Sequence, residues 1–271
     1  KRQTVFSPFR NQESISGGIT PLSRRDDINK LYIPSQKLEK FCKIVFWLNC
    51  MLSLVNIFLS GMATDIVSIL QIASALGFVS ASVIDDGLFW YNAEHERRKN
   101  SIQTAFGIRL SELETDGYYN NSVPPSMIKY ATNTFESVYF SKFIASKMLI
   151  YSLVKSLLAI IVLISVSWII ANGNILLIIA QAVFSAYIVE DTVYLTIYVN
   201  RLNALYDSIY TALITTGVHS SQKMPILLSF CTEYECIKAH YKIRLDSKIF
   251  IKYNHELSEK WNTISTHITT D

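Results

Sequence analysis

Four long apolar runs dominate this chain of 271 residues and limit what it can fold into. They cover residues 44–62, 66–84, 148–171 and 175–189, and the last continues past two acids into 192–199. A helix needs about 20 apolar residues to cross the core of a bilayer. The first three runs are long enough, whereas the fourth is shorter and has a buried core helix as its alternative. The mean hydropathy of +0.24 and the charged fraction of 17% favour a membrane protein over a cytosolic enzyme.

The distribution of basic residues predicts the topology of these runs. The connections within the two pairs, residues 63–65 and 172–174, contain no Lys or Arg. The other ends are flanked by Arg24, Arg25, Lys37, Lys40, Lys43, Arg97, Arg98, Lys99, Lys142, Lys147 and Arg201. Since loops rich in Lys and Arg stay in the cytoplasm, both termini and the central region are predicted to be cytoplasmic. The predicted fold class is an all-α membrane protein with four transmembrane helices in two hairpins and helical cytoplasmic extensions.

This topology divides the chain into five parts. They are a cytoplasmic N-terminal segment (1–43), a first transmembrane hairpin (44–84), a cytoplasmic helical insert (85–147), a second transmembrane hairpin (148–199) and a cytoplasmic C-terminal region (200–271). Residues 1–35 contain Gly and Pro and are expected to be coil or a linker, with the role of a plug, a lid or a protein contact left open.

Helices are expected in the cytoplasmic parts as well. They should cover 85–106 and 126–146, and a further helix should continue past Val199 to about Thr215, with breaks at Gly217 and Pro225. Residues 240–253 alternate apolar and charged side chains, which is typical of a β-hairpin, but their flanks favour a helix.

Paired acids follow both hairpins and are candidates for a pore mouth. They are Asp85 and Asp86 after the second run, and Glu190 and Asp191 after the fourth. Carboxylates near a bilayer are costly unless they face water or a partner, so a ring of them in an oligomer would favour cations. The alternative is that they mark where helices leave the bilayer beside an interfacial belt of Trp and Tyr.

A polar stripe runs along the first apolar segment. Asn49, Ser53, Asn56 and Ser60 are spaced by four, three and four residues, which places them on one helical face. Such side chains either line a wet path, and are then pore-lining, or form hydrogen bonds to neighbouring helices.

Basic residues gather in the cytoplasmic parts and form a candidate ligand-binding surface. They are Arg97, Arg98, Lys99, Arg109, Lys238, Lys242, Arg244, Lys248 and Lys252. They are suited to anionic headgroups at the inner leaflet or to a phosphorylated ligand, with Tyr234, Tyr241 and Tyr253 available to stack on bases. A solvated surface is the alternative for each single residue.

Enzyme motifs are absent from the sequence. It has no Walker A loop, no Gly-rich dinucleotide fingerprint, no His-Glu-x-x-His and no Gly-x-Ser-x-Gly. The four cysteines, in no metal-binding spacing, are expected to be thiols. We therefore expect no enzyme, no metal site and no cofactor.

Short segments resemble a known family. Residues 98–106 (RKNSIQTAF), 245–250 (LDSKIF) and 257–261 (LSEKW), together with the layout of two hairpins, a cytosolic insert and a helical tail, are similar to the four-transmembrane effectors of bacterial anti-phage defence. These effectors accompany nucleotidyltransferases, in CBASS-type and Hailong-like systems.

The resemblance implies a homo-oligomer, here expected to be a tetramer, in the inner membrane of the cell. A nucleotide or short oligonucleotide from a partner nucleotidyltransferase would open it as an ion channel or pore. Depolarisation would then stop the infected cell, which is abortive infection. The alternatives are a membrane scaffold that recruits a cytosolic partner without conducting, and a small transporter, for which four spans without a broken helix leave little room.

Overall fold

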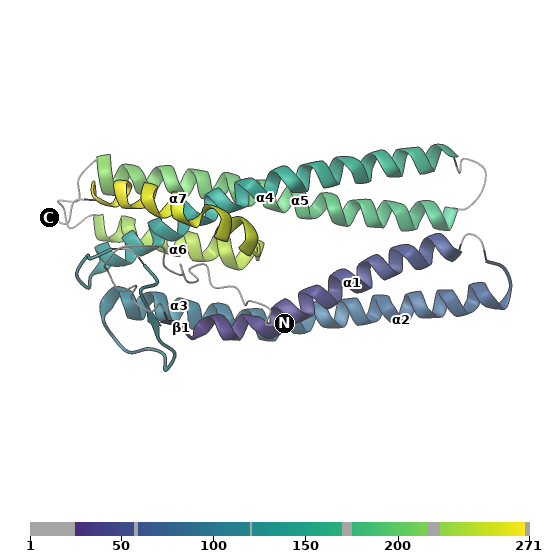
Figure 1. Ribbon diagram of the computed structural model, residues 1–271, viewed down its shortest axis with the longest axis horizontal. Coiled ribbons are helices and arrows are strands. Elements are labelled where there is room, and N and C mark those ends of the chain that lie inside the picture. The colour runs from purple at the N-terminus through teal and green to yellow at the C-terminus, as the bar shows by residue number, and fades with distance from the viewer. Residues whose placement is uncertain (1–24, 57–58, 120, 170–174, 216–222, 269–271) are drawn as a thin grey trace, which may run out of the picture. The chain divides into compact units, whose positions relative to one another are not determined.

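The computed structural model describes residues 25–56, 59–119, 121–169, 175–215 and 223–268 (Figure 1). This part of the chain is helical apart from loops and one two-residue β-pairing. The helices are α1 (Tyr32–Asn56), α2 (Met62–Ile84), α3 (Trp90–Phe106), α4 (Met127–Ile169), α5 (Ile175–Tyr210), α6 (Lys223–Tyr241) and α7 (Ser247–Ser265). The short elements are β1 (Arg25–Asp26), the 3₁₀ turn η1 (Ile28–Leu31), the π-helical segments η2 (Asp85–Phe89) and η3 (Thr211–Thr215), and β2 (Thr115–Asp116).

The chain divides into two compact units. The bundle unit consists of the described parts of 1–28, 96–153 and 192–271, and the hairpin unit consists of the described parts of 29–95 and 154–191. Two of the helices, α4 and α5, contribute to both units without a break.

The bundle unit has its hydrophobic core between α4, α5, α6 and α7 (Figure 1). Trp261 of α7 is completely buried and packs edge-on against Phe135 of α4, with ring centroids 5.3 Å apart. Other buried residues of this core include Val138, Ile144, Leu202, Leu205, Ile209, Leu227, Phe250 and Leu257. Each helix thus buries one apolar face, as amphipathic helices of a bundle do.

A small β-pairing joins the start of the described chain to the loop after α3. Arg25 pairs with Asp116 and Asp26 with Thr115 in antiparallel register. Gly107 ends α3 with a φ of 67°, a left-handed conformation that suits glycine, and its N–H donates to the carbonyl of Gln103 at 2.8 Å.

The hairpin unit contains α1 packed along α2. The side of α2 turned away from α1 is apolar and exposed, at Ile66, Ile69, Ile72, Leu76, Val79 and Val83. Among the described residues, two helices are long and apolar enough to cross a membrane by length and composition, Met62–Phe106 and Met127–Ile161. They contain the second predicted span and the beginning of the third.

The first hairpin differs from its predicted boundaries. The predicted run 44–62 is not one helix, because α1 ends at Asn56 and α2 begins at Met62. The connection therefore lies before Met62, where Gly61 adopts a φ of 64°, and residues 63–65 belong to the first turn of α2. The predicted connection 172–174 of the second hairpin lies outside the described residues.

The N-terminal prediction is also partly wrong. Residues 1–24 lie outside the described part, but the helix already begins at Tyr32, inside the segment 1–35 that was expected to be coil. Pro34 is in the first turn of α1, where its missing N–H costs no helical hydrogen bond.

Further corrections concern the C-terminal region. The predicted helices over 85–106, over 126–146 and up to Thr215 are confirmed. Pro225 does not break a helix, since it lies in the first turn of α6, and Gly217 is outside the described residues. Residues 240–253 form neither a continuous helix nor a β-hairpin: α6 ends at Tyr241, and Asp246 caps α7 by accepting from the N–H groups of Lys248 and Ile249.

Candidate functional site

The candidate pore-mouth acids differ in their surroundings. Asp85 and Asp86 lie in η2, where the helix widens to π geometry between α2 and α3. Asp85 is only 3% exposed, whereas Glu190 and Asp191 of α5 are exposed. Lys155 of α4 is an electrostatic neighbour of Asp191, so this acid has a cation beside it. π segments inside helices often mark functional positions.

The apolar run 192–199 after these acids contributes to the core of the bundle unit. Leu195, Tyr198 and Val199 are buried in the core of the bundle unit. Thr192 is bonded to Ser152 of α4, with 2.6 Å between the two hydroxyl oxygens. Helix packing therefore accounts for the buried residues of this run, whereas Val193, Tyr194 and Ile197 are exposed.

The polar stripe of α1 faces α2. Gln71 Nε2 of α2 donates to Ser53 Oγ at 2.9 Å, and Asn56 Nδ2 donates to Ser68 Oγ at 3.4 Å. Asn49 lies one turn before Ser53 on the same helix, and its carbonyl accepts from the Ser53 hydroxyl. Ser60 does not belong to this stripe, because α1 ends at Asn56 and Ser60 is exposed in the connection. At these positions the polar side chains join two helices of one chain.

The basic residues of α3 are engaged in contacts within the bundle unit. Arg97 is buried, forms an ion pair with Asp26 of β1 at 3.0 Å, and has its guanidinium 4.7 Å from the ring centre of Tyr118. Lys99 pairs with Glu96 at 2.7 Å, and the same glutamate accepts from the Ser111 hydroxyl. Arg98 is half-buried, and Arg109 is exposed in the loop after α3.

Cations from α3 and α6 converge on two tyrosines of the loop before α4. Arg97 and Lys238 both act electrostatically on Tyr118 and Tyr119. Lys238 also lies near Glu235, at 3.6 Å. Burial raises the pKa of both tyrosine hydroxyls above the usual value, and the nearby cations oppose this rise. We call Arg97, Lys238, Tyr118 and Tyr119 the cation–tyrosine cluster.

The remaining four basic residues lie on the segment between α6 and α7 and on the first turns of α7. Lys242 is exposed and has a φ of 48°, and Arg244 is half-buried. Lys248 and Lys252 are exposed on α7, one turn apart. The nine predicted ligand-binding residues therefore differ in their surroundings, from buried Arg97 to exposed Lys248 and Lys252.

Sequence reasoning missed the partners in the cation–tyrosine cluster. Asp26, Tyr118 and Tyr119 were not among the candidates, because they belong to segments far from α6 in the sequence. The only local signal for the tyrosines is their adjacency in a loop between two helices.

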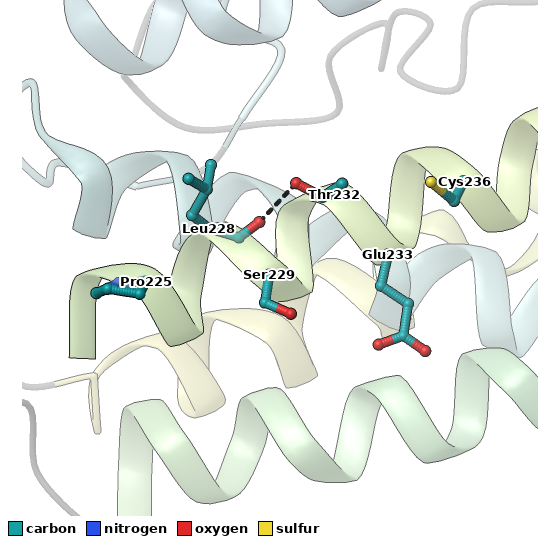
Figure 2. A pocket seen from close by; sticks show the side chains of 6 residues that line it. All are labelled: Pro225, Leu228, Ser229, Thr232, Glu233 and Cys236. Atoms are coloured by element: carbon teal, nitrogen blue, oxygen red, sulfur yellow. Dashed lines mark hydrogen bonds between the residues drawn. The ribbon is translucent and has the colours of Figure 1, made fainter. Parts of the chain in front are cut away.

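An exposed stripe on α6 was also missed. Pro225, Leu228, Ser229, Thr232, Glu233 and Cys236 line an open hollow along one side of this helix (Figure 2). The hydroxyl of Thr232 donates to the carbonyl of Leu228, one turn earlier, at 2.9 Å. Their helical spacing is the signal that could have identified this face.

Within the described residues, no group of three His, Cys, Asp or Glu side chains is placed to hold a metal ion. In the sequence Glu94-His95-Glu96, the first glutamate accepts from the Tyr32 hydroxyl at 2.7 Å and the second pairs with Lys99. These acids thus have structural partners.

Comparison with protein-family models, with curated proteins and with solved structures finds no match to this chain.

Proposed function

We propose that the chain is a multi-pass membrane protein with four spans and both termini in the cytoplasm. The support is the exposed apolar surface of α2 and α4, which needs a lipid environment, together with the absence of Lys and Arg from residues 57–65 and 170–174. Single cysteines placed at Ser60 and at Lys260, in a variant without the four native cysteines, would test this topology. A membrane-impermeant maleimide added to intact cells should label only position 60. Labelling of position 260 from outside would reverse the orientation.

For the function, we propose an oligomeric inner-membrane effector that forms an ion channel or pore gated by a nucleotide or oligonucleotide. The observation that carries the proposal is the continuity of α4 and α5, which run unbroken from the bundle unit into the hairpin unit. A change of packing in the bundle is then transmitted along rigid helices to the proposed spans. Such a protein would depolarise the membrane in anti-phage defence.

We propose that the cation–tyrosine cluster is the part of the bundle unit that binds the nucleotide or oligonucleotide ligand. Its two cations carry positive charge beside aromatic rings, which suits a phosphorylated ligand with a base to stack. An anionic ligand there would compete with Asp26 for Arg97 and so loosen the contact between β1 and α3. Four copies around an axis would bring Asp86, Glu190 and Asp191 together as an acidic ring at the pore mouth.

Ion flux from liposomes that contain the purified protein would test gating. We expect flux only when one member of a panel of cyclic nucleotides and short oligonucleotides is present. Lys238→Gln should raise the ligand concentration needed for half-maximal flux, whereas Lys260→Gln, a matched change in α7 that removes an exposed lysine, should not. Equal ligand responses in both variants would remove the cluster from the proposal.

A non-conducting scaffold is the second candidate function. It is favoured by the bonding of the α1 polar stripe to α2, which uses side chains that a pore would need, and by the exposed stripe on α6. Liposomes that stay sealed at every ligand concentration, with protein shown to be folded and inserted, would establish the scaffold over the channel.

A further inference from the structure

The segment 242–246 between α6 and α7 lies beside Met148 of α4. At this residue the helix changes from side chains buried in the bundle core to exposed apolar side chains. The N–H of Asp246 points to Met148 Sδ, 3.3 Å away. Before Met148, α4 is buried in the bundle core at Ile144 and Ala145. After it, Ile150, Tyr151 and Leu153 are exposed apolar side chains at the start of the third apolar run. The segment thus lies where the bundle unit ends and the proposed span of α4 begins.

Aromatic contacts also hold the last residue of α6, Tyr241, against α5 near the end of its apolar run. The ring of Tyr241 lies 6.2 Å from that of Tyr194 and 6.1 Å from that of Tyr198, both on α5. Tyr194 follows the acid pair at the end of the fourth apolar run within one turn. The α6–α7 segment therefore lies next to the beginning of the apolar part of α4 and the end of the apolar part of α5.

This end of the bundle is strongly basic. Residues 242–252 contain four basic residues and a single acid. The acid is Asp246, whose carboxylate caps α7. Lys147 of α4 adds a further cation nearby, since its ammonium group lies 5.6 Å from the ring centre of Tyr253. Glu256 of α7 interacts electrostatically with Lys147 and is bonded to Lys260 at 2.7 Å.

An exposed isoleucine lies among these cations. Ile251 is 62% exposed and lies three residues after Lys248, on the same side of α7, and Lys252 follows it directly in the sequence. A large apolar side chain flanked by lysines is typical of helices that lie in the interface of a membrane, where the lysine stems also cover apolar surface.

We propose that the α6–α7 segment and the first turns of α7 bind anionic lipid headgroups of the cytoplasmic leaflet through Lys242, Arg244, Lys248 and Lys252, with Ile251 inserted between them. The contact fastens α7, and with it the core residue Trp261, to the membrane surface. This inference rests on the proposal that α4 crosses the bilayer. According to this inference, these four residues bind lipid, whereas the proposed nucleotide or oligonucleotide ligand binds at the cation–tyrosine cluster.

Hydrogen–deuterium exchange of the full-length protein in nanodiscs would test the contact. Nanodiscs of phosphatidylcholine alone are compared with nanodiscs that also contain phosphatidylglycerol. The segment 242–246 is outside any helix, so the amides of residues 243–245 are expected to exchange faster than helical amides and to report a new contact sensitively. We expect exchange over residues 242–252 to slow several-fold when phosphatidylglycerol is present, and the effect to fade at high salt.

Two double variants with the same loss of charge separate a local contact from a general attraction. Lys248→Gln/Lys252→Gln should abolish the slowing, whereas Lys129→Gln/Lys260→Gln, at the start of α4 and the end of α7, should leave it intact. Gln is a good helix former, and the melting temperatures of both variants are measured as a check on folding.

Three results would overturn the inference. The first is equal exchange over residues 242–252 in both kinds of nanodisc, and the second is that both double variants lose the slowing of exchange equally. The third is that ATP, in nanodiscs of phosphatidylcholine alone, slows this exchange as much as phosphatidylglycerol does. The last would assign the surface to a soluble phosphorylated ligand. A protein that fails to enter nanodiscs at all would contradict the membrane proposal itself, which distinguishes that failure from a failure of the lipid contact.

Discussion

Cys231 and Cys236 lie on the same helix, α6, in contrasting environments. Cys231 is completely buried, its sulfur accepts from the Thr134 hydroxyl at 3.3 Å, and burial raises its pKa to about 11. Cys236 is exposed on the α6 stripe. Because the thiolate is the reactive form, reactivity should follow both exposure and pKa.

We therefore predict that a maleimide reacts with Cys236 in the folded protein and with Cys231 only after unfolding. The measurement is mass spectrometry of a variant in which Cys42 and Cys50 are replaced by Ala. Thr134→Ala serves as a control, since the buried thiol should remain protected without this hydrogen bond. Equal labelling of the two cysteines would show that α6 does not pack as described.

Buried tyrosines make the bundle unit sensitive to alkaline pH. Burial raises the pKa of Tyr118, Tyr119, Tyr130 and Tyr234 above the ordinary value of 10.0. The folded state therefore holds their protons more tightly than the unfolded state. This contribution to stability is complete below pH of about 10 and is lost as the pH rises from there through the folded-state pKa values.

We expect the melting temperature in detergent to fall above pH of about 10, and phenolate absorbance to appear together with unfolding. Both are followed in one spectrophotometric titration. Phenolate formation by these tyrosines at the ordinary pKa, without loss of helical circular dichroism, would contradict their burial.

The ion pair between Arg97 and Asp26 is the residue-scale link between β1 and α3. The two side chains are 11% and 9% exposed, so each is largely shielded from water. Removing one partner of a buried pair leaves the other charge uncompensated, which typically costs about 3 kcal/mol or more.

Asp26→Asn should therefore lower the free energy of unfolding by about 3 kcal/mol, measured by chemical denaturation in detergent. Lys260→Gln, which removes an exposed pair on α7, should change it little. A change as small in Asp26→Asn as in this control would show that the β1 contact contributes nothing to the fold.

At the scale of the elements, the polar stripe of α1 forms hydrogen bonds to α2 and so holds the two helices together. Ser53 and Gln71 meet at 2.9 Å across the two helices. Hydrogen bonds between membrane helices contribute about 1 kcal/mol or less on average.

Ser53→Ala and Gln71→Leu should each destabilise the hairpin by about 1 kcal/mol, and the double variant should cost less than the sum. A double-mutant cycle on thermal unfolding in detergent measures this coupling. Ser60→Ala, outside the stripe, should have no effect. Strictly additive losses would mean that the two side chains act independently and that the stripe has another role.

At the scale of the whole molecule, two units with different surfaces share the helices α4 and α5. The bundle unit holds a closed aromatic and aliphatic core, while apolar side chains of the hairpin unit are exposed along α2. Trp261 lies in the centre of the bundle core, with the rings of Phe135 and Tyr139 at 5.3 and 6.0 Å.

Trp261→Ala should destabilise the bundle unit by about 4 kcal/mol, because it removes a buried ring and leaves a cavity. Limited proteolysis should then cut α6 and α7 first, while the apolar helices stay in the membrane fraction. Trp261→Phe is the control and should lower the stability of the bundle unit by less, because it keeps an aromatic ring in the core. Proteolysis of the Ala variant at the same rate as the unchanged protein would show that this core does not hold the bundle together.

Local features of the sequence predicted most of the helices. Apolar runs and helix formers determine helical segments through near-neighbour preferences, so the helices over 85–106 and 126–146 were found correctly. The helix boundaries near Asn56, Met62 and Tyr241 were not predicted correctly. They are set by a turn at Gly61 and a cap at Asp246, each of which depends on the conformation of a single residue. The run 192–199 was predicted to belong to the second hairpin, and its residues Leu195, Tyr198 and Val199 are buried in the bundle core, because burial in a bundle and burial in lipid select the same side chains.

The candidate site was decided by contacts between segments distant in the sequence. Asp26 reaches Arg97 across 71 residues, and Asp246 reaches Met148 across 98. Contacts within the bundle unit pair Arg97, Lys99 and Lys238 with carboxylates, whereas Lys248 and Lys252 are exposed on α7. The order of charges along the sequence establishes that cations gather outside the apolar runs. Which of them are neutralised by carboxylates, and which lie beside the apolar part of α4, depends on packing that local preference does not encode.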